Sequence, residues 1–253
     1  MDGGAAFEAV TRIGFAARGL VYGLIGYLAL KSGRSEDASG IMDEMTGGGG
    51  RLLLAAMAAG FLAYAAWRLL DAWLDPERRG SGAKGLAQRV GAAGSGLVHL
   101  GFGVTAALHA LGNRGGGGRD ASEEGAATAL GLPGGSALLV AAALLLAGIG
   151  LVQLGKAWTL SFMRRLGTSG AAHRWVCWLG RGGLAARGVI FLGMALLLWR
   201  AAQTHSSGAA GGLGDALQSM PAALQTAVAA GLILFGLFSL AEARYRRIEA
   251  PVG

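Results

Sequence analysis

Residues 12–22 read Arg-Ile-Gly-Phe-Ala-Ala-Arg-Gly-Leu-Val-Tyr, and the same pattern returns twice without a gap. Residues 89–99 read Arg-Val-Gly-Ala-Ala-Gly-Ser-Gly-Leu-Val-His, and residues 181–191 read Arg-Gly-Gly-Leu-Ala-Ala-Arg-Gly-Val-Ile-Phe. The first arginine, both conserved glycine positions and one alanine recur in all three copies. A long period of this kind indicates tandem supersecondary units.

Each copy of the pattern opens a long apolar segment, and a second apolar segment follows it. A helix needs about 20 mainly apolar residues to cross the roughly 30 Å hydrocarbon core of a bilayer. Only 15% of the residues are charged, whereas soluble domains carry about 25%. The sequence therefore predicts six transmembrane helices, over residues 13–31, 52–72, 90–111, 136–158, 182–201 and 223–242.

Two spans per copy return the chain to the same side of the membrane, so the copies are parallel rather than inverted. Parallel repeats are related by an axis along the membrane normal. We predict an all-α polytopic membrane protein, a single domain over residues 1–253, with three parallel helical hairpins in a pseudo-threefold arrangement. The repeats cover residues 10–75, 87–162 and 179–247. Outer loops rich in Gly and Ser cover residues 32–51, 112–135 and 202–222.

The basic residues indicate how the chain is oriented. Most of the 22 Lys and Arg residues flank the same ends of the spans, as in Arg78-Arg79, Arg164-Arg165 and Arg246-Arg247. The positive-inside rule places such ends in the cytoplasm. We expect a multi-pass protein of the bacterial inner membrane with both termini cytoplasmic. The net charge of +7 then meets the lipid bilayer's anionic headgroups on that side, and nucleic acid is not an expected partner.

The even-numbered spans share an Ala-Gly pair, at Ala59-Gly60, Ala147-Gly148 and Ala230-Gly231. Eleven residues after each glycine come Asp71, Thr159 and Glu242. This spacing makes these three side chains candidates for one repeated position near the cytoplasmic ends of the spans.

Arg18 and Arg187 lie about 9 Å along the helix beyond the first arginine of their copies, at 1.5 Å per residue. A charge at that depth is costly without a partner. Copies one and three supply a carboxylate, whereas copy two replaces the arginine by Ser95 and the acid by Thr159. We therefore predict intramembrane pairs Arg18–Asp71 and Arg187–Glu242 and a neutral Ser95–Thr159 counterpart. Such pairs either staple hairpins together or line a path for a substrate or proton.

Tyr22, His99 and Phe191 share one repeat position, and pseudo-symmetry would bring them to a common level. His99 is the histidine that lies well inside a span, and packing with one hydrogen bond competes there with titration or metal binding. Gln153 is a candidate for a hydrogen bond between helices. These four residues are the candidate axial or polar positions.

Signatures of chemistry are missing from the sequence. The runs Gly47–Gly50 and Gly115–Gly118 lack the Gly-Lys-Ser/Thr ending of a phosphate loop. No His, Cys and carboxylate group has metal-site spacing, and no nucleophile has a base placed beside it. We predict no catalytic residues, no metal and no cofactor.

Three stretches resemble one bacterial family. They are Ala-Arg18-Gly19-Leu-Val-Tyr22-Gly-Leu-Ile-Gly-Tyr-Leu-Ala-Leu, Ala-Gly-Phe-Leu-Ala-Tyr-Ala-Ala-Trp67-Arg68 and Glu242-Ala-Arg244-Tyr245-Arg246-Arg247. The chain is similar along nearly its whole length to the domain of unknown function 1206 family. The resemblance implies a six-helix inner-membrane protein with three hairpins, and it implies no activity. The middle copy departs from the signature at Ser95 and His99.

We expect a non-catalytic structural or accessory membrane component that has room for a membrane-protein partner. The main alternative is a small transporter or channel with a path along the pseudo-threefold axis. A membrane enzyme ranks third and would need a pocket that groups His99 with Gln153 or the arginines. A polar axial cavity would favour transport, whereas an axis packed without water would favour the structural role.

Overall fold

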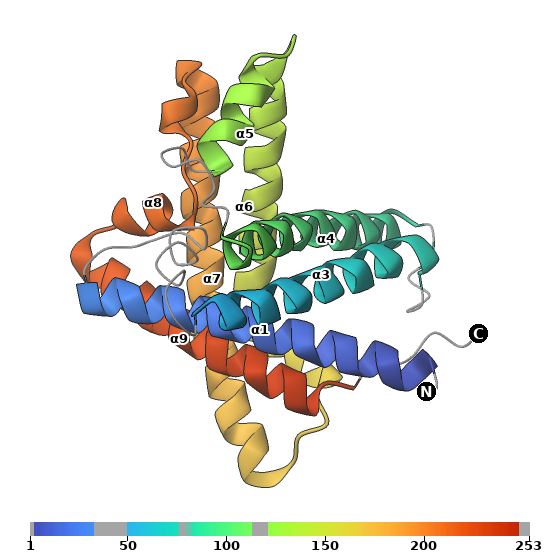
Figure 1. Ribbon diagram of the computed structural model, residues 1–253. Helices are drawn as coiled ribbons and strands as arrows, with labels where there is room; N and C mark the ends of the chain where they lie inside the picture. Colours follow the sequence, from blue (N-terminus) through green and yellow to red (C-terminus); the bar gives the residue numbers. More distant parts are fainter. Residues whose placement is uncertain (1–2, 33–49, 76–79, 81, 113–120, 248–253) are drawn as a thin grey trace.

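Six long helices make up most of the molecule (Figure 1). The computed structural model describes residues 3–32, 50–75, 80, 82–112 and 121–247. The long helices are α1 (Gly3–Ser32), α3 (Gly50–Leu74), α4 (Ala83–Ala110), α6 (Gly135–Thr159), α7 (Gly170–Thr204) and α9 (Ala222–Tyr245). Each is long and apolar enough to cross a membrane. The prediction of an all-α, polytopic membrane protein with six spans is confirmed.

Short helices fill the connections on the side predicted to be outside. They are α5 (Ala121–Leu130), α8 (Leu213–Gln218) and a 3₁₀ turn over Ser207–Ala209. A second 3₁₀ turn, Ser161–Arg165, follows α6 on the opposite side. Just after it, the chain pairs with the end of α9, where Gly167 donates its N–H to the Tyr245 carbonyl over 2.8 Å. This contact ties the α6–α7 connection to the C-terminal segment.

The most extensive packing joins helices of neighbouring repeats. Helix α3 packs along α4, α6 along α7, and α1 along α9. In the first two pairs, the first helix of one repeat lies against the second helix of the preceding repeat. In the third pair, α1 of the first repeat lies against α9 of the last repeat. Contacts within a repeat join α1 to α3 and α7 to α9 and are less extensive.

The first arginine of each repeat explains part of this pairing. Arg12 Nη1 donates to the carbonyl of Ala243 on α9, Arg89 Nε to that of Ala72 on α3, and Arg181 Nε to that of Ala157 on α6. The last carbonyls of a helix have no partner within the helix, and a cation beside them also offsets the helix dipole. The repeated arginine is therefore a cap that each repeat supplies to the one before it.

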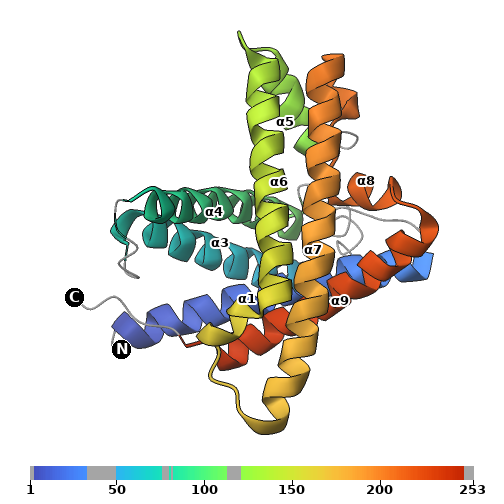
Figure 2. The same ribbon diagram turned by 180° about the vertical axis from the view of Figure 1, so that it is seen from behind.

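Helices α6 and α7 run across the other four helices (Figures 1 and 2). Following the contacts gives the order α4, α3, α1, α9, α7, α6. A ring would also need α4 to pack on α6, and among the described residues this pair is not one of the packed interfaces. The predicted pseudo-threefold arrangement therefore remains a prediction.

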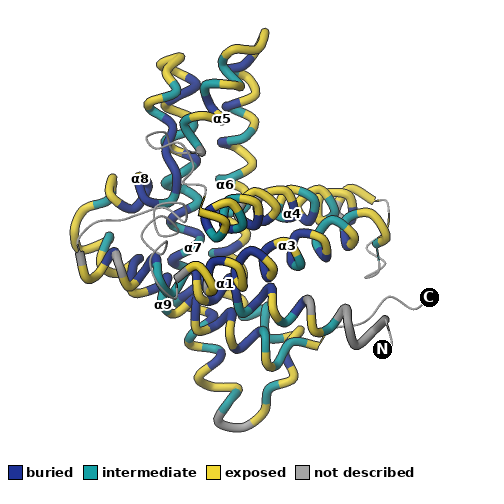
Figure 3. Tube along the Cα trace, in the orientation of Figure 1, coloured by how far each residue is buried: buried dark blue, intermediate teal, exposed yellow. Residues whose placement is uncertain are grey.

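Buried residues follow the faces on which helices meet, while α4 and the ends of α6 and α7 expose much of their surface (Figure 3). The largest buried cluster joins α1, α3 and α9 to the middle of α7, through residues such as Ile25, Phe61, Ile190 and Leu232. The leucines on the outward faces are apolar surface of the kind that lipid covers. The polar residues of the interior gather next to this cluster.

Candidate functional site

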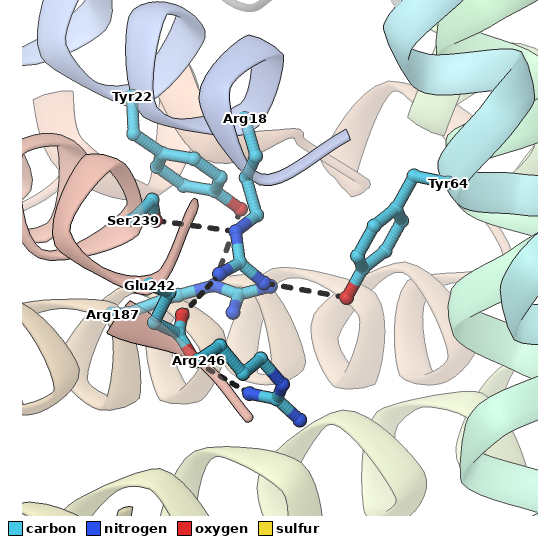
Figure 4. Close-up of polar contacts among 7 residues, drawn as sticks. All are labelled: Arg18, Tyr22, Tyr64, Arg187, Ser239, Glu242 and Arg246. Atoms are coloured by element: carbon cyan, nitrogen blue, oxygen red, sulfur yellow. Dashed lines mark hydrogen bonds and ion pairs between the residues drawn. The ribbon is translucent and has the colours of Figure 1, made fainter. Parts of the chain in front are cut away.

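An ion pair between Arg18 of α1 and Glu242 of α9 lies in the interior (Figure 4). Arg18 Nη2 donates to Glu242 Oε2 over 2.5 Å, and the two side chains are only 8% and 9% exposed. A guanidinium paired with a carboxylate forms short, charge-assisted hydrogen bonds. The pair therefore joins the first and last helices of the chain.

The other nitrogens of Arg18 are engaged as well. Its Nε donates to Ser239 Oγ over 3.2 Å, and its Nη1 donates to the Tyr64 hydroxyl over 3.3 Å. The rings of Phe15, Tyr64 and Phe235 lie within 4.8–5.6 Å of the guanidinium carbon. Aromatic faces attract a cation, and more strongly when water is excluded. Arg18 is thus held by α1, α3 and α9 together.

Glu242 binds a second guanidinium through its other oxygen. Arg246 Nη1 donates to Glu242 Oε1 over 2.6 Å, from four residues further along the chain. Arg246 also lies over the ring of Phe15, at 4.9 Å. Both oxygens of Glu242 are therefore paired with arginine.

Arg187 of α7 lies beside this group but makes different contacts (Figure 4). Its Nε donates to the Tyr22 hydroxyl over 3.2 Å. Its guanidinium carbon lies 4.8–5.2 Å from the ring centres of Tyr22, Phe191 and Phe235. The predicted Arg187–Glu242 pair is wrong, because Glu242 is already occupied by Arg18 and Arg246.

The predicted Arg18–Asp71 pair is wrong too. Asp71 is 2% exposed and accepts a hydrogen bond from Arg68 Nη1, one turn earlier on α3, over 2.9 Å. Arg18 turns towards α9, on which α1 packs more extensively than on α3. At the point of contact, a Cβ atom on Gly19 would come within 2.8 Å of the Gly236 carbonyl. Arg18 and Asp71 therefore each form a carboxylate–guanidinium pair, Arg18 with Glu242 and Asp71 with Arg68, but not with each other.

The same close contact recurs in the other helix pairs and gives the register of the repeats. A Cβ on Gly96 would meet the Ala65 carbonyl and Leu69, and one on Gly188 would meet the Gly150 carbonyl and Leu154. On α9 the corresponding residues are Gly236 and Leu240.

This register aligns Ala65 with Gly150 and Gly236, and the arginine caps at Ala72, Ala157 and Ala243 agree with it. The residue of α6 that corresponds to Asp71 and Glu242 is therefore Lys156. The alignment through Ala147-Gly148 was three residues out of register.

Ser95 and Thr159 do not form the predicted neutral counterpart. Thr159 Oγ1 donates instead to the Gly155 carbonyl of its own helix over 2.7 Å, and no hydrogen bond joins it to Ser95 within the described part of the chain. Gln153, which is 8% exposed, corresponds in the corrected register to Arg68 and Ser239. The second repeat thus places a neutral amide and a cation where its neighbours carry the Arg68–Asp71 and Ser239–Glu242 sets.

His99 is buried, and its Nδ1 lies 2.7 Å from the Ser95 carbonyl of the preceding turn. The Tyr64 ring lies 4.5 Å away and the Phe61 ring 5.9 Å away. Among the described residues no group of His, Cys, Asp and Glu side chains could hold a metal ion. Tyr22 and Phe191, which share its repeat position, both contact Arg187 instead. Tyr64 connects His99 to the Arg18–Glu242 group, because it contacts both His99 and Arg18.

Sequence reasoning missed Tyr64, Ser239 and Arg246 as members of this group. Arg246 lies four residues after Glu242, a spacing at which opposite charges meet on a helix, so it could have been found. In the corrected register Tyr64 corresponds to Phe235, and both rings pack on Arg18. Tyr64 and Ser239 could not be identified from the sequence alone, because they meet Arg18 only where α1 packs against α3 and α9.

Comparisons with known proteins agree with this repeat structure. A family model described as Domain of Unknown Function (DUF1206) matches residues 13–75, 90–160 and 182–246. The chain is 29% identical over 252 residues to the uncharacterized protein YxxB of Bacillus subtilis (strain 168), with 94% of this chain and 90% of the relative covered. No solved structure matches.

Proposed function

The chain belongs to the DUF1206 family, and from that premise we propose that it is a non-catalytic structural or accessory component of the bacterial inner membrane. The observation that supports this role most is the way the interior polar groups are used. Arg18 and Glu242 bind each other, Ser239, Tyr64 and Arg246. Aromatic rings pack around them, which favours a rigid internal brace over a site that exchanges ligands.

The free-energy cost of placing a charge in the membrane also favours this role. An isolated charge in a transmembrane helix is expensive, by about 3 kcal/mol on insertion scales and more in simulations. Mutual pairing across α1 and α9 offsets this cost only when both ends of the chain are folded together. The pair therefore selects the complete six-helix assembly, which is what a scaffold in the membrane needs.

We also propose that the termini lie in the cytoplasm and that a membrane-protein partner packs on α4. The exposed face of α4 carries Gly94 and Gly101, at which an added Cβ would meet no atom within 4 Å, and Leu97, which is 61% exposed. Small residues let a neighbouring helix approach closely in lipid. Anionic headgroups are the expected lipid partners at the cytoplasmic ends.

A photo-reactive amino acid at Leu97 tests the partner in native membranes. The matched control is Leu237 on α9, which is 46% exposed and has no glycine three or four residues away along the helix. We expect one discrete protein adduct from position 97 and lipid adducts from position 237. Equal patterns at the two positions would contradict a partner on α4.

A transporter remains the alternative, and the excess of cations supports it, since Arg18, Arg187 and Arg246 lie around the single carboxylate of Glu242 (Figure 4). Reconstituted proteoliposomes separate the two functions. An accessory protein should leave the flux of protons, potassium, chloride and phosphate at the level of protein-free vesicles. A flux that disappears in Arg187→Gln would replace our proposal by anion transport.

A further inference from the structure

The three helix pairs place different side chains at one equivalent contact. In the α1–α9 pair, this contact joins Arg18 of α1 to Glu242 of α9, and the two form an ion pair. In the α3–α4 pair the same two positions hold Asp71 and Ser95. In the α6–α7 pair they hold Lys156 and Arg187. The α6–α7 pair therefore has two cations where the α1–α9 pair has a cation and an anion.

The carboxylates nearby form their ion pairs with other residues. Glu242 gives one oxygen to Arg18 and the other to Arg246, and Asp71 pairs with Arg68. Within the described residues Arg187 forms no ion pair. The charges around Lys156 are mostly positive: Arg165, Arg187 and Arg68 act on it, and Glu242 is the one opposite charge among its interacting groups in the described part of the chain.

Arg187 also has donors to spare. Its Nε is bound to the Tyr22 hydroxyl, while neither of its terminal nitrogens has a hydrogen bond to a described residue. Neither terminal nitrogen is among the fully buried atoms without a partner, so this edge of the guanidinium keeps some accessible surface. The Lys156 side chain is on the exposed side of α6. The two cations thus mark a place that is open at one edge.

We propose that an oxyanion of the phosphate class binds between Arg187 and Lys156, in the position that the Glu242 carboxylate takes beside Arg18. Arginine recognises phosphate through two parallel N–H donors, and lysine adds a point charge. Both residues lie towards the ends of the spans that we predict to be cytoplasmic. The phosphate comes either from an anionic phospholipid headgroup or from free phosphate in the cytoplasm.

The test measures thermal unfolding of the full-length protein in a zwitterionic detergent, followed by tryptophan fluorescence. Sodium phosphate is titrated against sodium chloride at equal ionic strength, because general screening acts in both. Phosphatidylglycerol is titrated against phosphatidylcholine in parallel. We expect a saturable rise in Tm with phosphate, with phosphatidylglycerol, or with both.

Two variants assign the effect to this site. Arg187→Gln should raise the ligand concentration that gives half of the Tm increase at least about tenfold, which is the loss of affinity expected for a charge-assisted hydrogen bond. Lys156→Glu supplies an internal carboxylate, so it should abolish the response while keeping or raising the Tm without ligand. This second variant stays folded if the inference is correct. The matched control is Arg174→Gln, an exposed arginine on the same helix and the same side, which should respond like the wild type.

The outcomes separate the two sources. A response to phosphatidylglycerol alone identifies a lipid headgroup, and a response to inorganic phosphate identifies a site for the free anion as well. Absence of any response overturns the proposal. A response that survives in both Arg187→Gln and Lys156→Glu, or a Lys156→Glu protein that unfolds at a lower temperature, overturns it too.

Discussion

The pairing of Arg18 with Glu242 rather than Asp71 can be tested by a double-mutant cycle. The cycle combines Arg18→Gln with Glu242→Gln, and a parallel cycle combines Arg18→Gln with Asp71→Asn. The structure gives Arg18 one charge-assisted bond of 2.5 Å to Glu242 and none to Asp71, although both carboxylates are buried. Comparing two buried acids in the same protein removes the general cost of altering a buried charge.

The magnitude follows from the environment of the pair. Breaking a buried ion pair by removing one partner costs about 3–5 kcal/mol. Part of that cost is shared by both single variants, and coupling energies between contacting residues are about 0.5–3 kcal/mol. We expect a coupling of about 2 kcal/mol between Arg18 and Glu242, in the upper part of that range because the side chains are only 8% and 9% exposed. For Arg18 with Asp71 we expect less than about 0.5 kcal/mol.

The assay is reversible unfolding in mixed micelles, from which the free energy of unfolding of each variant is obtained. Membrane-insertion levels of the four proteins in each cycle serve as a control for failed biogenesis. A coupling with Asp71 that equals or exceeds the coupling with Glu242 would show that the helices pair within repeats, and our account of the interface would be refuted.

Three further predictions concern packing, capping and orientation. Gly183→Ala should cost about 1–3 kcal/mol of stability, because the new Cβ would lie 2.5 Å from Phe235 Cα, whereas Gly91→Ala at the same repeat position meets nothing within 4 Å and should be neutral; equal costs in thermal melts would disprove this. Arg89→Gln should lower the free energy of unfolding by about 1–2 kcal/mol, because two bonds to the carbonyls of Ala72 and Trp73 are lost. The exposed Arg200→Gln should not change it. An alkaline phosphatase fusion should be inactive at the C-terminus and active when inserted at Leu132, and the reverse activities would invert the proposed topology.

The sequence was sufficient for the six spans because bilayer thickness leaves little freedom in their length. It was not sufficient for the pairing. In a cycle of helices each second helix has two possible neighbours, one in its own repeat and one in the next. Glu242 can therefore meet Arg187 or Arg18, and counting charges within a repeat does not distinguish them. In the structure α9 packs more extensively on α1 than on α7, and this difference in helix packing cannot be read from the charges.

The register error in the second repeat has a similar origin. Ala and Gly are so frequent in this chain that an Ala-Gly pair has little value as a marker. Gly150 followed by Leu154 is the pattern that matches Ala65 and Leu69, and it lies three residues from the spurious match. A shift of three residues keeps the same general face of a helix, so hydrophobic periodicity could not reveal it. The arginine cap on Ala157 shows the correct register because it fixes one carbonyl.

The corrected register locates the asymmetry of the molecule. Gly14 packs on Tyr64 and Gly183 packs on Phe235, and these contacts join the two helices of repeats one and three. The equivalent residues of repeat two are Gly91 and Ile149, and Gly91 has open space beside it. An aliphatic side chain thus replaces a ring between α4 and α6, which are not one of the packed helix pairs among the described residues.

Ser95 and Lys156 lie on the same two helices, α4 and α6, and they replace an arginine and a carboxylate. The substitutions that distinguish the second repeat therefore fall on α4 and α6, two helices that are not among the packed pairs of the described residues. The middle copy keeps the capping arginine, which binds the end of α3, but it lacks the ring contact that joins the two helices of the other repeats. The exposed face of α4 and the cations on α6 and α7 are the places where we propose that a partner and an anion bind.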